Sequence, residues 1–141
     1  MSMPRWTAGL ALLLALAGQP GFADEADADR RVAARPSLTL IIDDLGQNPA
    51  RDRRVLQLPG PVALAILPDT RHAAELAEQA HRAGKTVMLH MPMAPAGGRF
   101  AWHPQLPHDE LARRLDAALA AVPHVRGLNN HMGSAMTEQP Q

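Results

Sequence analysis

The sequence predicts an α/β fold in which parallel strands alternate with helices. Short, largely apolar segments recur along the chain, helix-forming segments separate them, and each apolar segment stops abruptly at polar residues. Strands that are apolar throughout are typical of parallel sheets covered on both faces. Their alternation with helices favours βαβ connections. We therefore expect three regions: a signal peptide (residues 1–23), a flexible linker (24–36) and an α/β domain (37–141).

The first 23 residues have the layout of a signal peptide. One positive charge at Arg5 precedes an apolar stretch over 6–18, and Gly21-Phe22-Ala23 precedes the acidic Asp24. The stretch is shorter than the roughly 20 residues of a membrane-spanning helix. We expect cleavage after Ala23, export, in particular to the periplasm, and no permanent membrane span. Residues 24–36 are mostly Ala, Asp and Arg, which predicts a flexible linker.

The remaining chain divides into four predicted strands and three predicted helices. The strands are residues 38–42, 62–67, 86–89 and about 125–128, and the helices are 49–58, 71–83 and 109–122. Asp69 or Thr70 is expected to cap the second helix and Gly84 to end it. The third helix carries one apolar stripe, formed by Leu111, Leu115, Ala118, Leu119 and Val122. Residues 93–107 contain several Pro and Gly and predict a loop.

The composition excludes several classes of function. There is no Cys, which removes thiolate catalysis, cysteine metal sites and disulfides from consideration. The 14 basic and 14 acidic side chains balance, so no broad positive field favours nucleic acid as a partner. Only 3% of residues are aromatic, so the core must be built from aliphatic side chains and Met. Any bound metal must be held by His and carboxylate.

Polar residues follow each predicted strand: Asp43-Asp44, Asp69, His90 and His131. Parallel strands place their C-terminal ends on one face, where α/β proteins carry their sites. Two carboxylates and two imidazoles on one face would suit zinc. Taken singly, each has a structural alternative: Asp43-Asp44 as a cap, His90 as a hydrogen-bonded core residue, and His131 as part of a tight turn. Asp69 directly precedes a helix and is expected to be its N-cap.

Four segments support a family resemblance. Residues 41–46 (Ile-Ile-Asp-Asp-Leu-Gly), 64–68 (Leu-Ala-Ile-Leu-Pro), 89–93 (Leu-His-Met-Pro-Met) and 127–134 (Gly-Leu-Asn-Asn-His-Met-Gly-Ser) resemble the divergent polysaccharide deacetylase family in order and spacing. The resemblance covers residues 37–137 and implies a deformed (β/α) barrel, a divalent metal, zinc in particular, and an acetylated glycan as substrate. It implies that Asp44, His90 and His131 bind the metal. It further implies that Asp43 takes a proton from metal-bound water, with Asn130 and Ser134 as supporting donors.

The sequence departs from the wider deacetylase superfamily in two respects. The superfamily's His-x-x-x-His spacing is absent, because Ala94 and Ala135 stand four residues after His90 and His131, so the ligands must come from separate strands. The chain also ends at Gln141. The resemblance therefore implies about half a barrel, with the general acid expected beyond this point. Two hypotheses follow: a metal-dependent deacetylase, or a periplasmic glycan-binding or envelope-scaffold protein without turnover. The oligomeric state is not predicted.

Overall fold

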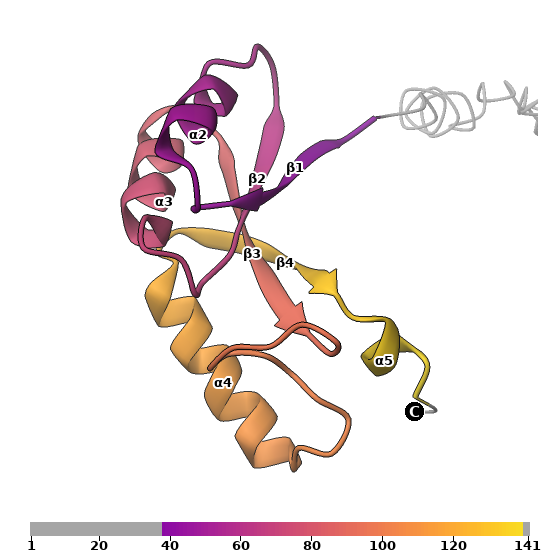
Figure 1. The fold of residues 1–141 in the computed structure, drawn as a ribbon. Coiled ribbons are helices and arrows are strands. Elements are labelled where there is room, and N and C mark those ends of the chain that lie inside the picture. Colours follow the sequence, from indigo (N-terminus) through magenta and orange to yellow (C-terminus); the bar gives the residue numbers. More distant parts are fainter. Residues whose placement is uncertain (1–37, 140–141) are drawn as a thin grey trace, which may run out of the picture. The chain divides into compact units, whose positions relative to one another are not determined.

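The computed structural model describes residues 38–139 (Figure 1). The predicted signal peptide and linker lie outside these residues. Within the described part of the chain, no helix is long and apolar enough to cross a membrane. The elements in chain order are β1 (Leu40–Leu45), α2 (Pro49–Leu56), β2 (Val62–Ile66), α3 (Ala73–Arg82), β3 (Thr86–Met93), α4 (His108–Ala121), β4 (Val125–Met132) and α5 (Ser134–Thr137).

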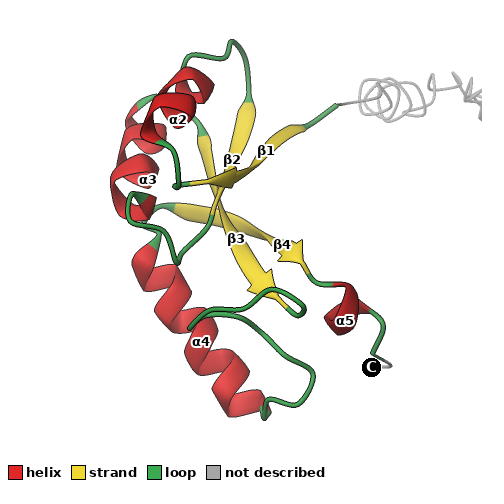
Figure 2. Cartoon of the chain, viewed as in Figure 1, coloured by secondary structure: helices red, strands yellow, loops and turns green. Residues whose placement is uncertain are grey.

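The four strands form one parallel sheet in the order β1-β2-β3-β4. Each strand lies beside the next one in the sequence, and α2, α3 and α4 make the three crossovers on the same side of the sheet (Figure 2). A doubly wound sheet reverses its strand order at a switch point, whereas a (β/α) barrel keeps the order sequential. The predicted parallel α/β fold is confirmed, and its strand order is that of a barrel.

The core lies between the sheet and the helices. Leu64, Ile66, Leu89 and Met91 are fully buried and contribute the largest side chains of the central strands. Helix α3 supplies mostly alanines to this interface, so it can approach the sheet closely. Each large aliphatic side chain buried here stabilises the fold by roughly 1.5–3 kcal/mol relative to an exposed position. Strand β2, buried along its whole length, is the centre of this packing.

The edge strands differ from the sequence prediction. Strand β1 exposes 49% of Leu40 and 38% of Ile41, and β4 exposes 40% of Leu128. Coverage on both faces, expected for all four strands, is therefore wrong for β1 and β4, which are the edge strands of the described sheet and have a neighbouring strand there on one side only. Leu119, predicted on the buried stripe of α4, is likewise 39% exposed, whereas Ala118 and Val122 are buried.

Three strands extend further than predicted. Strand β1 continues to Leu45, β3 to Met93 and β4 to Met132. The polar residues that were expected to end these strands still pair in the ladder, with His90 opposite Asn129 and Pro92 opposite His131. The backbone hydrogen bonds of a parallel sheet do not depend on apolar side chains. The candidate site residues therefore lie near the C-terminal ends of the strands themselves and not in the loops that follow.

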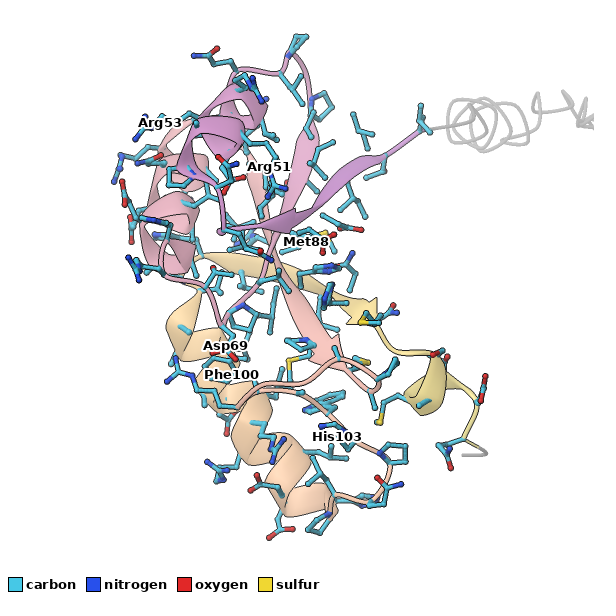
Figure 3. The ribbon with its side chains drawn as sticks, in the orientation of Figure 1. Arg51, Arg53, Asp69, Met88, Phe100 and His103 are labelled. Atoms are coloured by element: carbon cyan, nitrogen blue, oxygen red, sulfur yellow. The ribbon has the colours of Figure 1, made fainter. Side chains whose placement is uncertain are left out.

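The start of α3 also corrects the sequence prediction. The helix begins at Ala73 without a side-chain cap, so neither Asp69 nor Thr70 has the expected role. The Thr70 hydroxyl donates to the Leu67 carbonyl instead. The Asp69 carboxylate accepts from the Arg99 backbone N–H and pairs with the Arg99 guanidinium, which ties two loops together beside Phe100 (Figure 3).

Helices α2 and α4 differ at their N-termini, because α2 has a side-chain cap and α4 has none. Asn48 caps α2 by accepting a hydrogen bond from Arg51 N, with Pro49 in the first turn. Helix α4 begins with two acidic residues, and hydrogen bonds from Arg113 and Arg114 lower the pKa of Glu110 to about 2. Gly84, with a φ of +70°, ends α3 as expected.

Candidate metal centre

A β-bulge brings two consecutive carboxylates of β1 to the same side of the sheet. In the β1–β2 ladder Ile42 pairs with Leu64 and Leu45 pairs with Ile66, so two residues of β1 lie opposite one of β2. Those two residues are Asp43 and Asp44, and Asp44 has a left-handed φ of 59°. Consecutive strand residues normally point to opposite faces. The bulge instead allows both side chains to contact polar groups of β3 and β4.

Asp44, His90 and His131 bring three potential ligand atoms together. Asp44 Oδ1 lies 3.2 Å from His90 Nε2 and 2.9 Å from His131 Nδ1. The two ring nitrogens are 3.2 Å apart. Zinc–ligand bonds of about 2.0–2.1 Å at tetrahedral angles separate neighbouring ligand atoms by about 3.3 Å. The triangle therefore has nearly the dimensions of one face of a zinc coordination tetrahedron.

Asn129 determines which nitrogen of His90 carries the proton. Its Nδ2 donates to Asp43 Oδ1 at 2.9 Å, which directs its Oδ1 toward His90 Nδ1, also at 2.9 Å. An amide oxygen only accepts, so His90 Nδ1 must be the donor. Nε2, the other ring nitrogen, lies toward the Asp44 carboxylate. In a ring with its only proton on Nδ1, the Nε2 lone pair and Asp44 Oδ1 are both available to one cation.

The hydrogen bond between Asp43 and Asn129 also reports on the shape of the sheet. These residues belong to the two edge strands, which in a flat sheet of four strands would lie about 14 Å apart. Only a strongly curved sheet brings their side chains within 2.9 Å. In the central strand β2, the small residue Ala65 lies opposite Asp43-Asp44.

The site is buried at its base and open above. His90 is 3% exposed, whereas the side chains of His131 and Asp44 are 28% and 55% exposed. An open hollow of about 680 Å³ begins beside His131 and is lined with Gln47, Asp69 and Thr70 among others. A metal held by the three side chains would therefore keep an accessible position, which is characteristic of catalytic and not structural zinc sites.

The remaining predicted site residues lie apart from this triangle. Asn130 points to the other side of β4 and donates through Nδ2 to the Met132 carbonyl, where it supports a turn in which Met132 and Gly133 both have positive φ values. Ser134 begins α5. The structure does not bring either residue into contact with Asp44, His90 or His131 through a side-chain hydrogen bond among the described residues.

Sequence reasoning missed the residues that support the site. Asn129 stands two residues before His131, and period-two alternation along β4 would have placed both on one face. Arg51 and Asp52 were not predicted to take part in the site, although Asp52 is 2% exposed and accepts a hydrogen bond from Gly46 N. Nothing in the local pattern of α2 marks Asp52 as buried.

Comparison with known proteins identifies the family. Residues 40–141 match the sequence profile described as divergent polysaccharide deacetylase. The chain belongs to this family. It is 40% identical over 104 residues to the uncharacterized protein YibQ of Escherichia coli, a match covering 71% of the chain and 33% of that protein. It is 31% identical over 112 residues to an uncharacterized protein of Haemophilus influenzae, covering 77% of the chain and 40% of the relative.

A solved structure supports the fold of this family member. The crystal structure of an uncharacterized protein from Agrobacterium tumefaciens superimposes with a TM-score of 0.61 at 20% identity. The superposition covers 67% of the chain and 42% of the other protein. The chain thus spans between a third and about two fifths of the proteins that it matches.

Proposed function

We propose that this chain carries the metal centre of a zinc-dependent hydrolase that removes acetyl groups from the amino sugars of an envelope glycan. The observation that carries the proposal is the convergence of Asp44 Oδ1, His90 Nε2 and His131 Nδ1 within 3.2 Å of one another. The family supports a deacetylase-like activity. The signal-peptide layout of residues 1–23 supports export to the periplasm, where such a glycan would be met.

The side chains of the site have different roles in the proposed reaction. Asp44, His90 and His131 would hold the metal, and zinc at this position supplies a Lewis acid that acidifies water and polarises an acyl oxygen. Asp43 takes the proton of the attacking water, as the carboxylate that directly precedes the metal ligand Asp44 in the chain. Asn129 occupies one oxygen of Asp43, which fixes the carboxylate and leaves its other oxygen to accept the proton.

The hollow beside His131 suits the sugar. It is lined by Gln47, Asp69 and Thr70, which offer amide, carboxylate and hydroxyl groups, and by Pro92 and Pro95, which offer apolar surface. Sugar rings present hydroxyls at their rims and C–H groups on their faces, and binding sites commonly combine apolar walls with a few placed polar groups. The substrate would enter from the exposed side of Asp44 and His131.

Acetate release from an acetylated amino-sugar oligomer tests the proposal. With the zinc-loaded chain we expect measurable release, and Asp43→Asn should lower the rate by about 10²–10⁴-fold because the general base is lost. Zinc stoichiometry should stay unchanged in that variant. Asp116→Asn, which alters an exposed carboxylate on α4, is the matched control and should keep the wild-type rate.

Two outcomes would contradict the proposal in different ways. Zinc bound at Asp44, His90 and His131 with no acetate released from any acetylated oligomer would support a glycan-binding protein in place of an enzyme. Acetate release that Asp43→Asn does not slow would show that the base is another residue.

A further inference from the structure

Asp44 has a backbone conformation that its own side chain does not favour. Its φ of 59° lies in the left-handed region, which is uncommon for residues other than glycine, although Asp tolerates it better than most. Such a conformation is strained and persists only where surrounding contacts hold it. The direction of the Asp44 carboxylate depends on this conformation, so the contacts that hold it also determine the geometry of the metal centre.

Two neighbouring residues of α2 make those contacts. Arg51 donates from Nη2 to the Asp44 carbonyl at 2.5 Å and from Nε to Asp52 Oδ1 at 3.0 Å. The other oxygen of Asp52, Oδ2, accepts from the Gly46 backbone N–H at 2.9 Å. The pair therefore binds the backbone on both sides of the turn, at the carbonyl of Asp44 and at the amide of Gly46.

The burial of Asp52 indicates that the packing of the fold holds this arrangement in place. Asp52 is 2% exposed, and an ionised carboxylate in that position is tolerated only when it is paired and hydrogen-bonded. Both of its oxygens are used, one by the Arg51 guanidinium and one by Gly46 N–H. Gly46 itself has a φ of +105°, and a Cβ there would lie 2.2 Å from the Thr70 hydroxyl oxygen, so the turn has little freedom to relax.

We propose that Arg51 and Asp52 are positioning residues that hold Asp44 in its metal-binding geometry. This inference rests on the proposed function, because it assigns Asp44 to the metal. Neither residue reaches the metal position itself: both act through the backbone of residues 44–46. The planar guanidinium suits this role, since it bridges two acceptors at once and a Lys ammonium cannot reproduce that fork.

Helix α2 also provides a matched control. Arg53 lies two residues after Arg51 and is exposed, and the two side chains lie on different sides of α2 (Figure 3). Arg53→Met removes the same charge and the same hydrogen-bonding capacity from the same helix as Arg51→Met. It does not remove a contact with the 44–46 turn.

Zinc titration of the full chain by calorimetry tests the proposal. We expect Arg51→Met to weaken zinc binding about 10–100-fold, the usual effect of removing an outer-sphere partner. Arg53→Met should bind zinc and melt like the wild type, whereas Arg51→Met should melt at a lower temperature without metal, because the buried Asp52 carboxylate loses its partner. Equal zinc affinities for Arg51→Met and the wild type would overturn the proposal. If Arg51→Met does not fold, Arg51→Lys replaces it, with weaker binding expected and unchanged binding contradicting the inference.

Amide hydrogen exchange separates this inference from the proposed function. In the metal-free protein, the Gly46 N–H should exchange slowly in the wild type and several-fold faster in Arg51→Met and Asp52→Asn. If the wild type binds no zinc, the proposed function fails, and the exchange rate of Gly46 alone decides whether the two residues hold the turn. An exchange rate that neither variant changes would overturn the inference.

Discussion

The chain places a histidine pair at each end of β3 and β4, and the two pairs differ in geometry. Near the C-terminal ends, the rings of His90 and His131 have centroids 4.9 Å apart and planes inclined at 67°. Near the N-terminal ends, His81 and His124 stack face to face, with centroids 3.9 Å apart and an angle of 6°. In inclined rings the nitrogen lone pairs can converge on one point, whereas in stacked rings they lie in separate parallel planes.

The carboxylates beside the two histidine pairs also differ in the contacts they make. Asp44 Oδ1 contacts both His90 and His131 and comes from a third strand. Glu78 contacts His124 at 3.0 Å, and its other oxygen lies 3.7 Å from Arg82, a competing cation. Two histidines and a carboxylate can therefore bind one metal ion only where their lone pairs converge on one point. This depends on the inclination of the rings, on the tautomer of each ring and on the direction of the carboxylate.

Removal of one histidine from each pair should give the largest difference in zinc affinity between two variants. His90→Ala deletes a proposed ligand and should weaken zinc binding by more than the roughly 100-fold limit of outer-sphere changes. His81→Ala deletes a ring of the stacked pair and should leave zinc affinity unchanged. Calorimetric titration measures both. Equal losses in the two variants would remove the distinction between the pairs.

Substitution of Asn129 should weaken zinc binding by His90 and His131, but by less than the removal of His90. Asn129→Ala removes the acceptor that keeps the proton on His90 Nδ1, so Nε2 is no longer held as the lone-pair nitrogen. We expect zinc affinity to fall about 10–100-fold. Gln79→Ala, which removes a half-buried side-chain amide from α3, serves as the control. The ¹⁵N chemical shifts of the His90 ring should show the change of tautomer, and an unchanged tautomer in Asn129→Ala would contradict this role.

The stacked pair should affect stability only, and by the smallest amount. His81→Ala removes the ring that packs on His124 and should lower the free energy of unfolding by about 0.5–1.5 kcal/mol, as for other aromatic pairs. Urea denaturation followed by circular dichroism measures this difference. A loss of bound zinc in the same variant would show that the stacked pair also holds metal.

The sequence predicted the sheet and the order of its elements, because apolar strand segments, helix-forming segments and the helix stop at Gly84 act locally. It also predicted Asp43, Asp44, His90 and His131 together, since each stands near the end of a parallel strand. It did not predict that these residues continue the strands, because backbone pairing is independent of side-chain polarity.

The features that support the site could not be predicted, because they depend on tertiary contacts. The bulge at Asp43-Asp44 and the burial of Asp52 become visible only once β1 is paired and α2 is packed. Asp69 satisfied every local rule for an N-cap, yet its carboxylate contacts Arg99, 30 residues away. Local patterns cannot register contacts at that separation.

Zinc-edge X-ray absorption of the wild-type chain tests whether Asp44, His90 and His131 form a metal centre. We expect one zinc ion per chain with two imidazole nitrogens and carboxylate oxygen among its ligands, at about 2.0–2.2 Å. The two imidazole contributions should disappear together with the zinc in His90→Ala and remain in His81→Ala. A zinc ion coordinated by one imidazole or none, or the absence of zinc from the wild-type chain after loading, would contradict the account.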